Sequence, residues 1–212
     1  MINCNNIYVN TQSSIKIILD KIIYFDPFKI NNKINDADII FITHDHYDHF
    51  DINSINNIIN DNTIIICPKC MEENIKIINS NNIYLLDIYE DIKIGNMFIK
   101  TIPAYNINKN FHPKSKKYLG YLITYNNITY YISGDTDLNE DNSKIKCDIV
   151  LIPIGGYYTM DVEAAYEFIN IVKPSIVIPT HYGSIVGDKL DGKKLKDKLS
   201  DTNIKVIEKL KF

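Results

Sequence analysis

The chain is a succession of short apolar runs, each interrupted by a polar turn after a few residues. Runs of this length are typical of strands rather than helices. Their abundance of isoleucine supports this, because branched side chains pack well on a sheet. We therefore expect strands at residues 7–9, 15–19, 22–25, 39–42, 63–66, 83–86, 97–104, 118–125, 128–133, 148–153, 175–179 and 204–210.

Four stretches place their apolar side chains at helical spacing instead, at residues 51–60, 67–79, 161–173 and 192–200. Asp51 and Asp161 stand where a carboxylate can cap the first and third of them. The expected strands thus form two groups, each accompanied by helices, and no linker divides the chain. We predict one α/β domain over residues 1–212, built as a four-layer αβ/βα sandwich with its functional residues on loops at one edge.

Bulk composition narrows the function classes. A chain of 212 residues, 45% of them hydrophobic, can bury a sizeable core. Its net charge is −3 and it has no arginine, so we expect no nucleic-acid partner. The first six residues lack a secretory pattern, and no apolar run reaches the roughly 18 residues of a membrane span. We expect a cytoplasmic protein.

The four cysteines, Cys4, Cys67, Cys70 and Cys147, are too few for a disulfide framework in a chain of this size. Cys67 and Cys70 form a Cys-x-x-Cys motif, which fits either a redox pair or half of a zinc site. Cys4 and Cys147 stand alone and supply no second pair. We therefore favour small buried thiols at the start of the expected helix over a redox role.

The strongest chemical signal follows the apolar strand at residues 39–42. Three of the five histidines lie within six positions, in the pattern His44-x-His46-x-Asp48-His49. Imidazole and carboxylate are ligands of divalent metals such as zinc. In an extended segment, residues two apart point the same way, about 7 Å from each other, so His44 and His46 can approach one ion. The turn that follows would direct Asp48 and His49 towards another.

This pattern resembles the first signature of the metallo-β-lactamase superfamily, and the similarity runs from about Ile7 to Gly183. It is closest to a group of small metal-dependent hydrolases, related to the sugar-phosphate lactonase and N-acyl phospholipid phosphodiesterase branches. The resemblance implies the metallo-β-lactamase fold. The residues that carry the resemblance are Ala104-Tyr105-Asn106, His112-Pro113-Lys114, Gly134-Asp135-Thr136-Asp137, Pro153-Ile154-Gly155-Gly156-Tyr157, Thr159-Met160-Asp161 and His181-Tyr182-Gly183.

The resemblance further implies a site for two divalent metal ions in which every histidine of the chain is a ligand. An imidazole-rich set favours Zn2+, and Mn2+ or Fe2+ is also compatible. In the diiron branch a glutamate replaces the second motif histidine, so His46 argues against that branch. One ion would take His44, His46 and His112, the other would take Asp48, His49 and His181, and Asp135 would bridge them.

Two such cations, about 3.5–4 Å apart, lower the pKa of a shared water towards neutrality. The resemblance therefore implies a hydrolase that attacks an ester, lactone or phosphoester with a metal-bridging hydroxide. Asp48 would be the catalytic residue that steers the proton of this water. No Ser-His-Asp or Cys-His scheme competes, because each histidine is already committed.

Two segments near the expected site have open roles. Asp26 begins an Asp-Pro-Phe step of the kind that the superfamily places beside its metals, and it either orients a ligand or forms a plain turn. The first loop is Asn10-Thr11-Gln12-Ser13, where many members carry a Gly-His pair. The resemblance therefore assigns this loop no function.

The substrate is the least determined part of the prediction. Lys109, Lys114, Lys116 and Lys117 surround His112, so one hypothesis is that they attract a small anionic substrate. A solvated loop is the commoner meaning of such a run. Two alternatives to a small-molecule hydrolase also stay open: an RNA-processing nuclease, which needs a basic face that this acidic chain lacks, and a non-catalytic metal-binding module.

Overall fold

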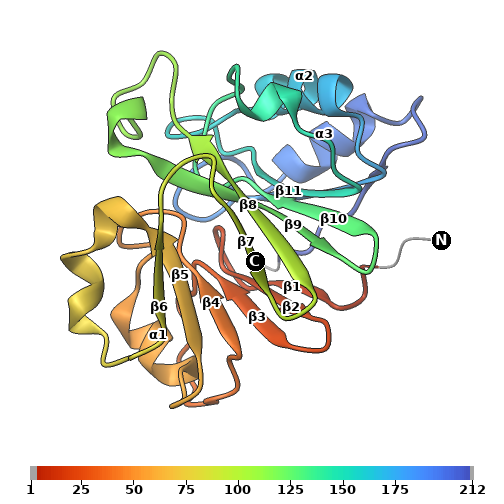
Figure 1. The fold of residues 1–212 in the computed structure, drawn as a ribbon. Helices are drawn as coiled ribbons and strands as arrows, with labels where there is room; N and C mark the ends of the chain where they lie inside the picture. Colours follow the sequence, from red (N-terminus) through yellow and green to blue (C-terminus); the bar gives the residue numbers. More distant parts are fainter. Residues whose placement is uncertain (1–3, 211–212) are drawn as a thin grey trace.

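A computed structural model describes residues 4–210, so the outermost residues of the predicted domain 1–212 lie outside the described part. Two β-sheets pack face to face, and helices cover their outer surfaces (Figure 1). The predicted four-layer αβ/βα sandwich is confirmed. None of the described helices is long and apolar enough to cross a membrane.

The first sheet contains six strands in sequence order. Its first three strands pair antiparallel, and from β3 to β6 every pairing is parallel. The strands are β1 (Ile7–Val9), β2 (Ile15–Ile18), β3 (Ile22–Phe25), β4 (Ile39–Phe41), β5 (Ile64–Pro68) and β6 (Ile83–Leu86).

The second sheet contains seven strands in the order β13-β12-β11-β10-β9-β8-β7. The pairings from β10 to β13 are parallel, and those from β7 to β10 are antiparallel. The strands are β7 (Asp91–Ile94), β8 (Met97–Ala104), β9 (Tyr118–Tyr125), β10 (Ile128–Ile132), β11 (Ile149–Pro153), β12 (Ile176–Thr180) and β13 (Lys205–Val206).

Three α-helices form the outer layers. Helix α1 (Ile52–Ile58) covers the first sheet, and α2 (Val162–Val172) and α3 (Asp191–Lys198) cover the second. Asp51 and Asp161 accept from backbone N–H groups at the starts of α1 and α2, as their positions predicted. Short 3₁₀ turns lie at Lys69–Met71, Asn74–Ile77, Lys114–Lys116 and Asn142–Lys144.

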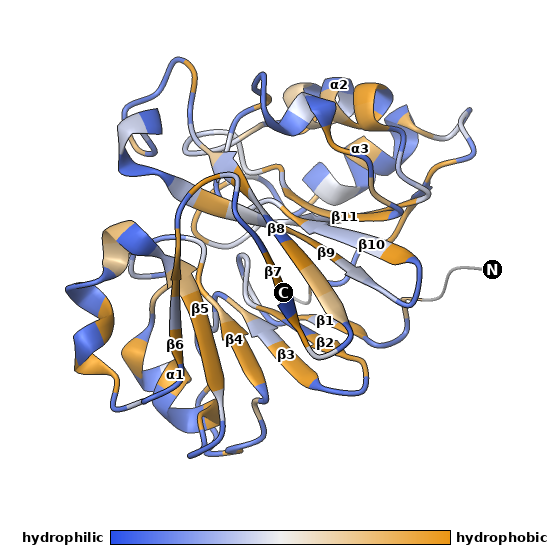
Figure 2. Ribbon diagram, in the orientation of Figure 1, coloured by the Kyte–Doolittle hydropathy of each residue, from blue (hydrophilic) through white to orange (hydrophobic). Residues whose placement is uncertain are grey.

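The central strands are apolar on both faces because each separates two cores. In β4, Ile39 and Phe41 face the core between the sheets, while Ile40 faces the core under α1. In β11, Leu151 faces the core between the sheets and Val150 faces α2. Figure 2 shows these strands as hydrophobic ribbons between hydrophilic loops. Continuous apolar runs therefore mark strands buried on both sides.

Two secondary-structure predictions were wrong. Residues 67–79 do not form one helix but two short 3₁₀ turns, because Cys67 and Pro68 still belong to β5. Strand β7, which pairs with β8 at the sheet edge, was not predicted, since its alternating charged residues weaken the apolar signal. The predicted strand at 204–210 is paired only over Lys205–Val206.

Candidate metal centre

Loops that follow β4, β8, β10 and β12 meet at one edge of the sandwich and bring all seven predicted ligands together. Among the described residues, three overlapping groups have ligand atoms that all lie within 4.8 Å of one another. These groups are His44 with His46 and His112, His44 with His49 and Asp135, and Asp48 with His49 and His181.

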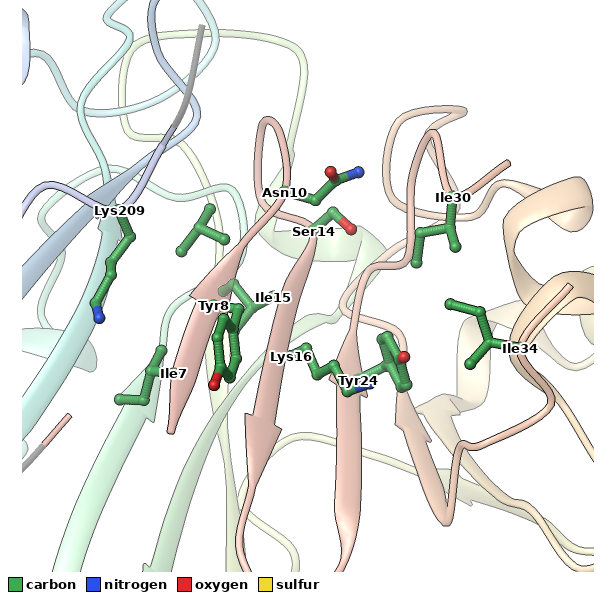
Figure 3. A pocket seen from close by; sticks show the side chains of 11 residues that line it. Ile7, Tyr8, Asn10, Ser14, Ile15, Lys16, Tyr24, Ile30, Ile34 and Lys209 are labelled. Carbon is green, nitrogen blue, oxygen red and sulfur yellow. The ribbon is translucent and has the colours of Figure 1, made fainter. Parts of the chain in front are cut away.

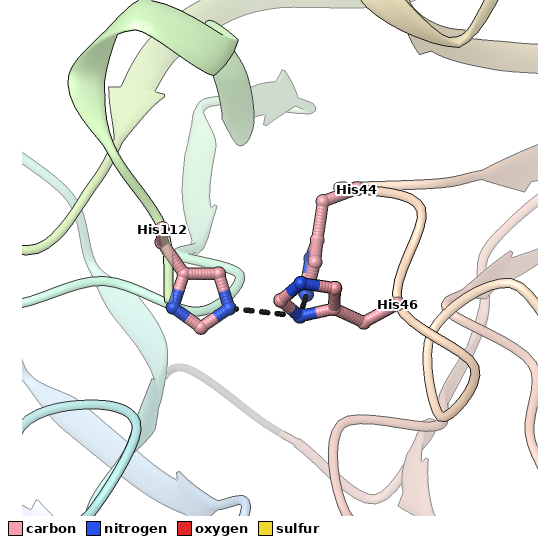
Figure 4. A group of neighbouring side chains, drawn as sticks. All are labelled: His44, His46 and His112. Atoms are coloured by element: carbon pink, nitrogen blue, oxygen red, sulfur yellow. Dashed lines mark hydrogen bonds between the residues drawn. The ribbon is translucent and has the colours of Figure 1, made fainter. Parts of the chain in front are cut away.

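The first group is a set of three imidazoles from two distant loops (Figure 4). His46 Nδ1 lies 3.1 Å from His44 Nε2 and 3.2 Å from His112 Nε2. A tetrahedral zinc with bonds of about 2.0–2.1 Å would separate its nitrogens by roughly 3.3 Å. The observed spacing therefore fits three nitrogens around one small cation.

Hydrogen bonds on the far side of two rings decide which nitrogens are free. His112 Nδ1 lies 3.0 Å from Asn106 Oδ1, a carbonyl-type oxygen that can only accept. His44 Nδ1 lies 2.9 Å from Thr43 Oγ1, whose proton is committed to Asp26 at 2.7 Å. Both rings therefore carry their proton on Nδ1 and direct an Nε2 lone pair at His46. One proton on His46 cannot satisfy both lone pairs, but a cation can.

The four other predicted ligands combine imidazoles with carboxylates, and we call them the second group: Asp48, His49, His181 and Asp135. Asp48 Oδ2 lies 3.3 Å from His181 Nε2 and 3.7 Å from His49 Nε2. Asp135 Oδ1 lies 3.4 Å from His49 Nε2, and its Oδ2 lies 3.1 Å from His181 Nε2 and 3.5 Å from His112 Nε2. Asp135 thus faces both groups, which is the arrangement that a bridging ligand requires.

Unpaired buried atoms mark the centre of the second group. His49 Nε2 and Asp135 Oδ1 are fully buried, and neither has a hydrogen-bond partner among the described residues. Buried polar atoms are almost always paired, so each such exception needs an explanation. A divalent cation bound between them supplies one, and the donor set fits it.

The pKa values follow the same division. Burial lowers the pKa of His112 to about 4 and that of His44 well below its usual value, so both rings are neutral at pH 7, as metal ligation requires. Burial would also lower the pKa of His181, but Asp135 and Asp48 raise it to about 9. Burial would raise the pKa of Asp48, but His181 and His49 lower it to about 2. The carboxylates of the second group therefore favour positive charge at its imidazoles, which a bound cation would supply in place of protons.

Asp26 braces both groups from behind. Its fully buried carboxylate accepts from His49 Nδ1 at 2.7 Å, from Thr43 N at 2.8 Å and from Thr43 Oγ1 at 2.7 Å. Through Thr43 it also fixes the proton of His44. Of the two roles left open by the sequence, the structure favours the orienting one, because such outer partners set the tautomer of a ligand.

His112 is not a free loop histidine. Its backbone N donates to Asn106 Oδ1 at 3.0 Å, and its carbonyl accepts from Asn106 N at 2.8 Å. Asp135 is placed by a close approach of its own loop, since a Cβ on Gly134 would lie 2.9 Å from Thr43 Cβ. Only glycine fits there, and its φ of 62° favours it further.

Gln12 was missed as a site residue. Its Nε2 lies 3.4 Å from both Asp48 Oδ2 and His181 Nε2, and its Oε1 is buried without a partner among the described residues. The backbone carbonyl of Gln12 also accepts from the backbone N–H of His181 at 3.0 Å. The signal available in the sequence was its position in the first loop, which the family resemblance left without a function.

Backbone strain gathers around the second group. Gln12, Asp26 and His181 are buried, and all have left-handed backbones with φ of 49°, 44° and 54°. Each such residue costs of order 1–3 kcal/mol, and such residues cluster at functional sites. The fold therefore holds these side chains in place against a local preference.

A pocket of about 260 Å³ opens onto the metal-ligand cluster. None of the four lysines near His112 lines it. Lys109 pairs with Asp137 at 2.6 Å, and Lys114 and Lys117 pair with other surface carboxylates. The hypothesis that these lysines attract an anionic substrate thus receives no support. The pocket is lined by His46, Tyr47, Asp48, Phe111, His112, Asp135, Tyr158, His181 and Ile185.

A second hollow, of about 500 Å³, lies against β1 to β3 (Figure 3). It contains no histidine, and its Lys16 already pairs with Asp36 at 2.6 Å. The two thiols of the Cys-x-x-Cys motif differ in environment. Cys67 is buried, and burial raises its pKa to about 12, whereas Cys70 is exposed, so the expectation of two buried thiols was wrong for Cys70.

Known proteins resemble this chain over most of its length. A family model described as the β-lactamase superfamily domain matches residues 7–181. A metal-dependent hydrolase of Staphylothermus marinus is 30% identical over 86% of this chain and 80% of its own. A metal-dependent hydrolase of Pyrococcus horikoshii is 28% identical over 91% of this chain and 92% of its own.

Solved structures agree in fold. A crystal structure from Parabacteroides distasonis, titled a metal-dependent hydrolase, has a TM-score of 0.83 and 29% identity, and the match covers 97% of this chain and 93% of that one. Igni18, a metallo hydrolase of Ignicoccus hospitalis, has a TM-score of 0.79 at 22% identity, with 95% and 93% covered. At that identity the second likeness shows the fold alone.

Proposed function

Because this chain belongs to the metallo-β-lactamase superfamily and is a metal-dependent hydrolase, we propose that it binds two divalent cations and hydrolyses a small ester, lactone or phosphoester. The proposed ligands are the seven side chains that meet at the sheet edge: His44, His46, His112, Asp48, His49, His181 and Asp135. The proposal also treats residues 1–212 as a single domain, and the cytoplasmic location stays a prediction.

The observation that carries the proposal is the convergence of lone pairs at two adjacent points. Three imidazole nitrogens meet at the first, and imidazoles with carboxylates meet at the second. Asp135 faces both, at 3.5 Å from His112 Nε2 and 3.1 Å from His181 Nε2. A single-ion site would not need a carboxylate directed at both groups.

The bound cations would supply Lewis acidity, which lowers the pKa of water and polarises the oxygen of the bond under attack. The chain's own residues supply position. Asp26 and Asn106 hold the ligand rings, and Asp48 stays ionised because of His181 and His49. The Asp48 carboxylate can therefore accept a hydrogen bond from the attacking water and orient it.

We favour zinc as the native metal, because five of the seven ligands are imidazoles. Manganese and iron remain compatible with the two carboxylates. Elemental analysis of protein purified without added metal separates these cases. Two ions per chain support the dinuclear proposal, and one ion contradicts it.

The activity is tested with metal-loaded protein and a panel of esters, lactones and phosphodiesters. His44→Ala and Asp135→Ala should each abolish turnover and lower the metal content. Asp91→Ala, an exposed aspartate on β7 paired with Lys100, is the matched control and should change neither. Cleavage of an RNA oligomer alone would favour the nuclease alternative, and two bound ions with no turnover on any of these substrates would favour a non-catalytic module.

A further inference from the structure

We propose that the substrate of this site carries a compact, uncharged apolar group, such as a phenyl ring or a branched alkyl chain, beside the bond that is hydrolysed. The inference rests on the proposed function and names its substrate class. It is carried by an aromatic wall, formed by Tyr47, Phe111 and Tyr158, that borders the metal-ligand cluster in the pocket of about 260 Å³.

The size of this pocket sets the size of the group. A volume of about 260 Å³ lies just below the range of roughly 300–1,000 Å³ that is usual for small-molecule sites. A single ring and the adjoining carbonyl or phosphoryl centre suit such a space, whereas a polymer segment does not. The substrate is therefore a small molecule.

Several apolar side chains that line this pocket are exposed to solvent. Tyr47 is 67% exposed, Phe111 is 38% exposed, and Ile185 on the opposite loop is 39% exposed. All three line the same pocket. Exposed apolar residues that gather at one concave site mark a ligand-binding surface more often than scattered ones do.

Ring contacts make the wall a built feature. Phe111 meets Tyr158 edge to face, with centroids 4.6 Å apart, and Tyr157 meets Tyr158 in the same way at 4.8 Å. Tyr47 packs edge to face on Phe28, with ring centroids 5.9 Å apart. Aromatic pairs of this geometry stabilise each other, so the rings hold their positions without a ligand.

The wall is also tied to the metal-ligand cluster. Asn106, which fixes His112, donates from Nδ2 to the carbonyl of Tyr158 at 2.9 Å. Lys109 donates to the next carbonyl, that of Thr159, at 2.6 Å. A Cβ on Gly155 would overlap the carbonyl oxygen of His181, so glycine there lets the wall's loop lie against a ligand loop. One network therefore positions both ligands and wall.

The side chains that line the pocket offer no partner to a second anionic group, one that lies away from the bond at the cations. The lining of the pocket contains two carboxylates, Asp48 and Asp135, and no lysine. Lys109 is the lysine nearest in the chain to the wall, and its ammonium group is already bonded to Asp137. A second negative charge on the substrate, held away from the cations, would thus have no ammonium group among the lining residues to pair with.

The experiment compares matched substrates that differ in one group. The pairs are methyl 3-phenylpropanoate against monomethyl succinate, the γ-phenyl against the γ-carboxyl derivative of γ-butyrolactone, and methyl 2-phenylethyl phosphate against methyl 2-carboxyethyl phosphate. For metal-loaded protein, kcat/KM should favour the phenyl member by roughly tenfold or more in the pair that is cleaved. Equal values, or a preference for the carboxylate member, would overturn the inference.

Variants test whether the wall is responsible. Phe111→Ala and Tyr158→Ala should each reduce the phenyl preference about tenfold, mainly through KM, while elemental analysis shows unchanged metal content. Phe98→Ala is the control, because Phe98 is 57% exposed on β8 and does not line the pocket. If one wall variant loses metal, the other decides, and an unchanged preference in both rejects the role of the wall.

A binding measurement separates failure of the inference from failure of the proposed function. Phenylacetamide, which keeps the ring but resists hydrolysis, is titrated calorimetrically into the metal-loaded protein, with succinamate as the charged partner. Phenylacetamide should bind, and Phe111→Ala should weaken it about tenfold, even if none of the six substrates is cleaved. Cleavage without selective phenylacetamide binding refutes the inference alone.

Discussion

Asp26→Asn is the substitution that tests most directly how the fold prepares the metal centre. The side-chain volume hardly changes, but the carboxylate becomes an amide. Asp26 Oδ2 now accepts from Thr43 Oγ1 and from His49 Nδ1, each at 2.7 Å. An amide nitrogen at that place would face two donors and satisfy neither.

The magnitude follows from the burial of this group. Asp26 has 0% of its side chain exposed, so water cannot replace either lost bond. Removing one partner of a buried charged pair costs about 3–5 kcal/mol in the free energy of unfolding. The net loss is smaller than this, because burial disfavours the ionised form of Asp26 in the native protein and raises its pKa. Loss of an outer hydrogen bond to a ligand should also weaken metal binding by about 10- to 100-fold.

Two assays separate these effects. Urea unfolding monitored by circular dichroism gives the stability, and competition with a chromophoric chelator at a temperature where the variant is folded gives the metal affinity. Thr43→Val removes the hydroxyl that links Asp26 to His44 but keeps the bond between Asp26 and His49, so it should show a smaller loss of affinity. Asp51→Asn is the control, since asparagine caps α1 as well as aspartate does. An Asp26→Asn variant with metal affinity within threefold of the natural protein would refute the reasoning.

Three further outcomes are expected. Gln12→Leu should lower the affinity for one of the two ions, so that dialysed protein retains about one per chain; two retained ions would contradict a role for Gln12 at Asp48. The pKa of His112 is about 4 in the folded chain and about 6.5 unfolded, so the unfolded state takes up the proton first. Chelator-treated protein should therefore lose stability as the pH falls from about 6.5 towards 4. In His112→Asn the urea midpoint should fall less steeply with pH than in the natural protein, and equal slopes in the two proteins would be inconsistent with a buried neutral ring. In native protein at pH 8, the exposed Cys70 should react with a thiol reagent faster than Cys67, whose pKa is about 12; peptide mapping that finds Cys67 labelled as fast as Cys70 would show that β5 is not buried as described.

Local patterns were sufficient for most of the fold. The apolar runs at 39–42 and 148–153 predicted strands, and the structure has strands at Ile39–Phe41 and Ile149–Pro153. Both are apolar throughout because each lies between two cores. Asn126 and Asn127, which separate two of the predicted strands, join β9 and β10 in a tight hairpin, and both have the positive φ that asparagine tolerates. Where local signals were weak, the predictions failed. Residues 67–79 have helical spacing, but their first two residues pair with β6.

The sequence by itself determined that imidazole and carboxylate side chains are the candidate metal ligands. It also determined that His44, His46, Asp48 and His49 follow the end of one strand, since spacing along a strand is a local property. Only the tertiary structure decided that Gln12 reaches the same cluster, that Lys109, Lys114 and Lys117 pair with carboxylates outside the pocket lining, and that three aromatic rings border the pocket. These contacts join segments far apart in the chain, such as Gln12 and His181. Their formation depends on how two sheets and their loops pack, which no periodicity within one segment records.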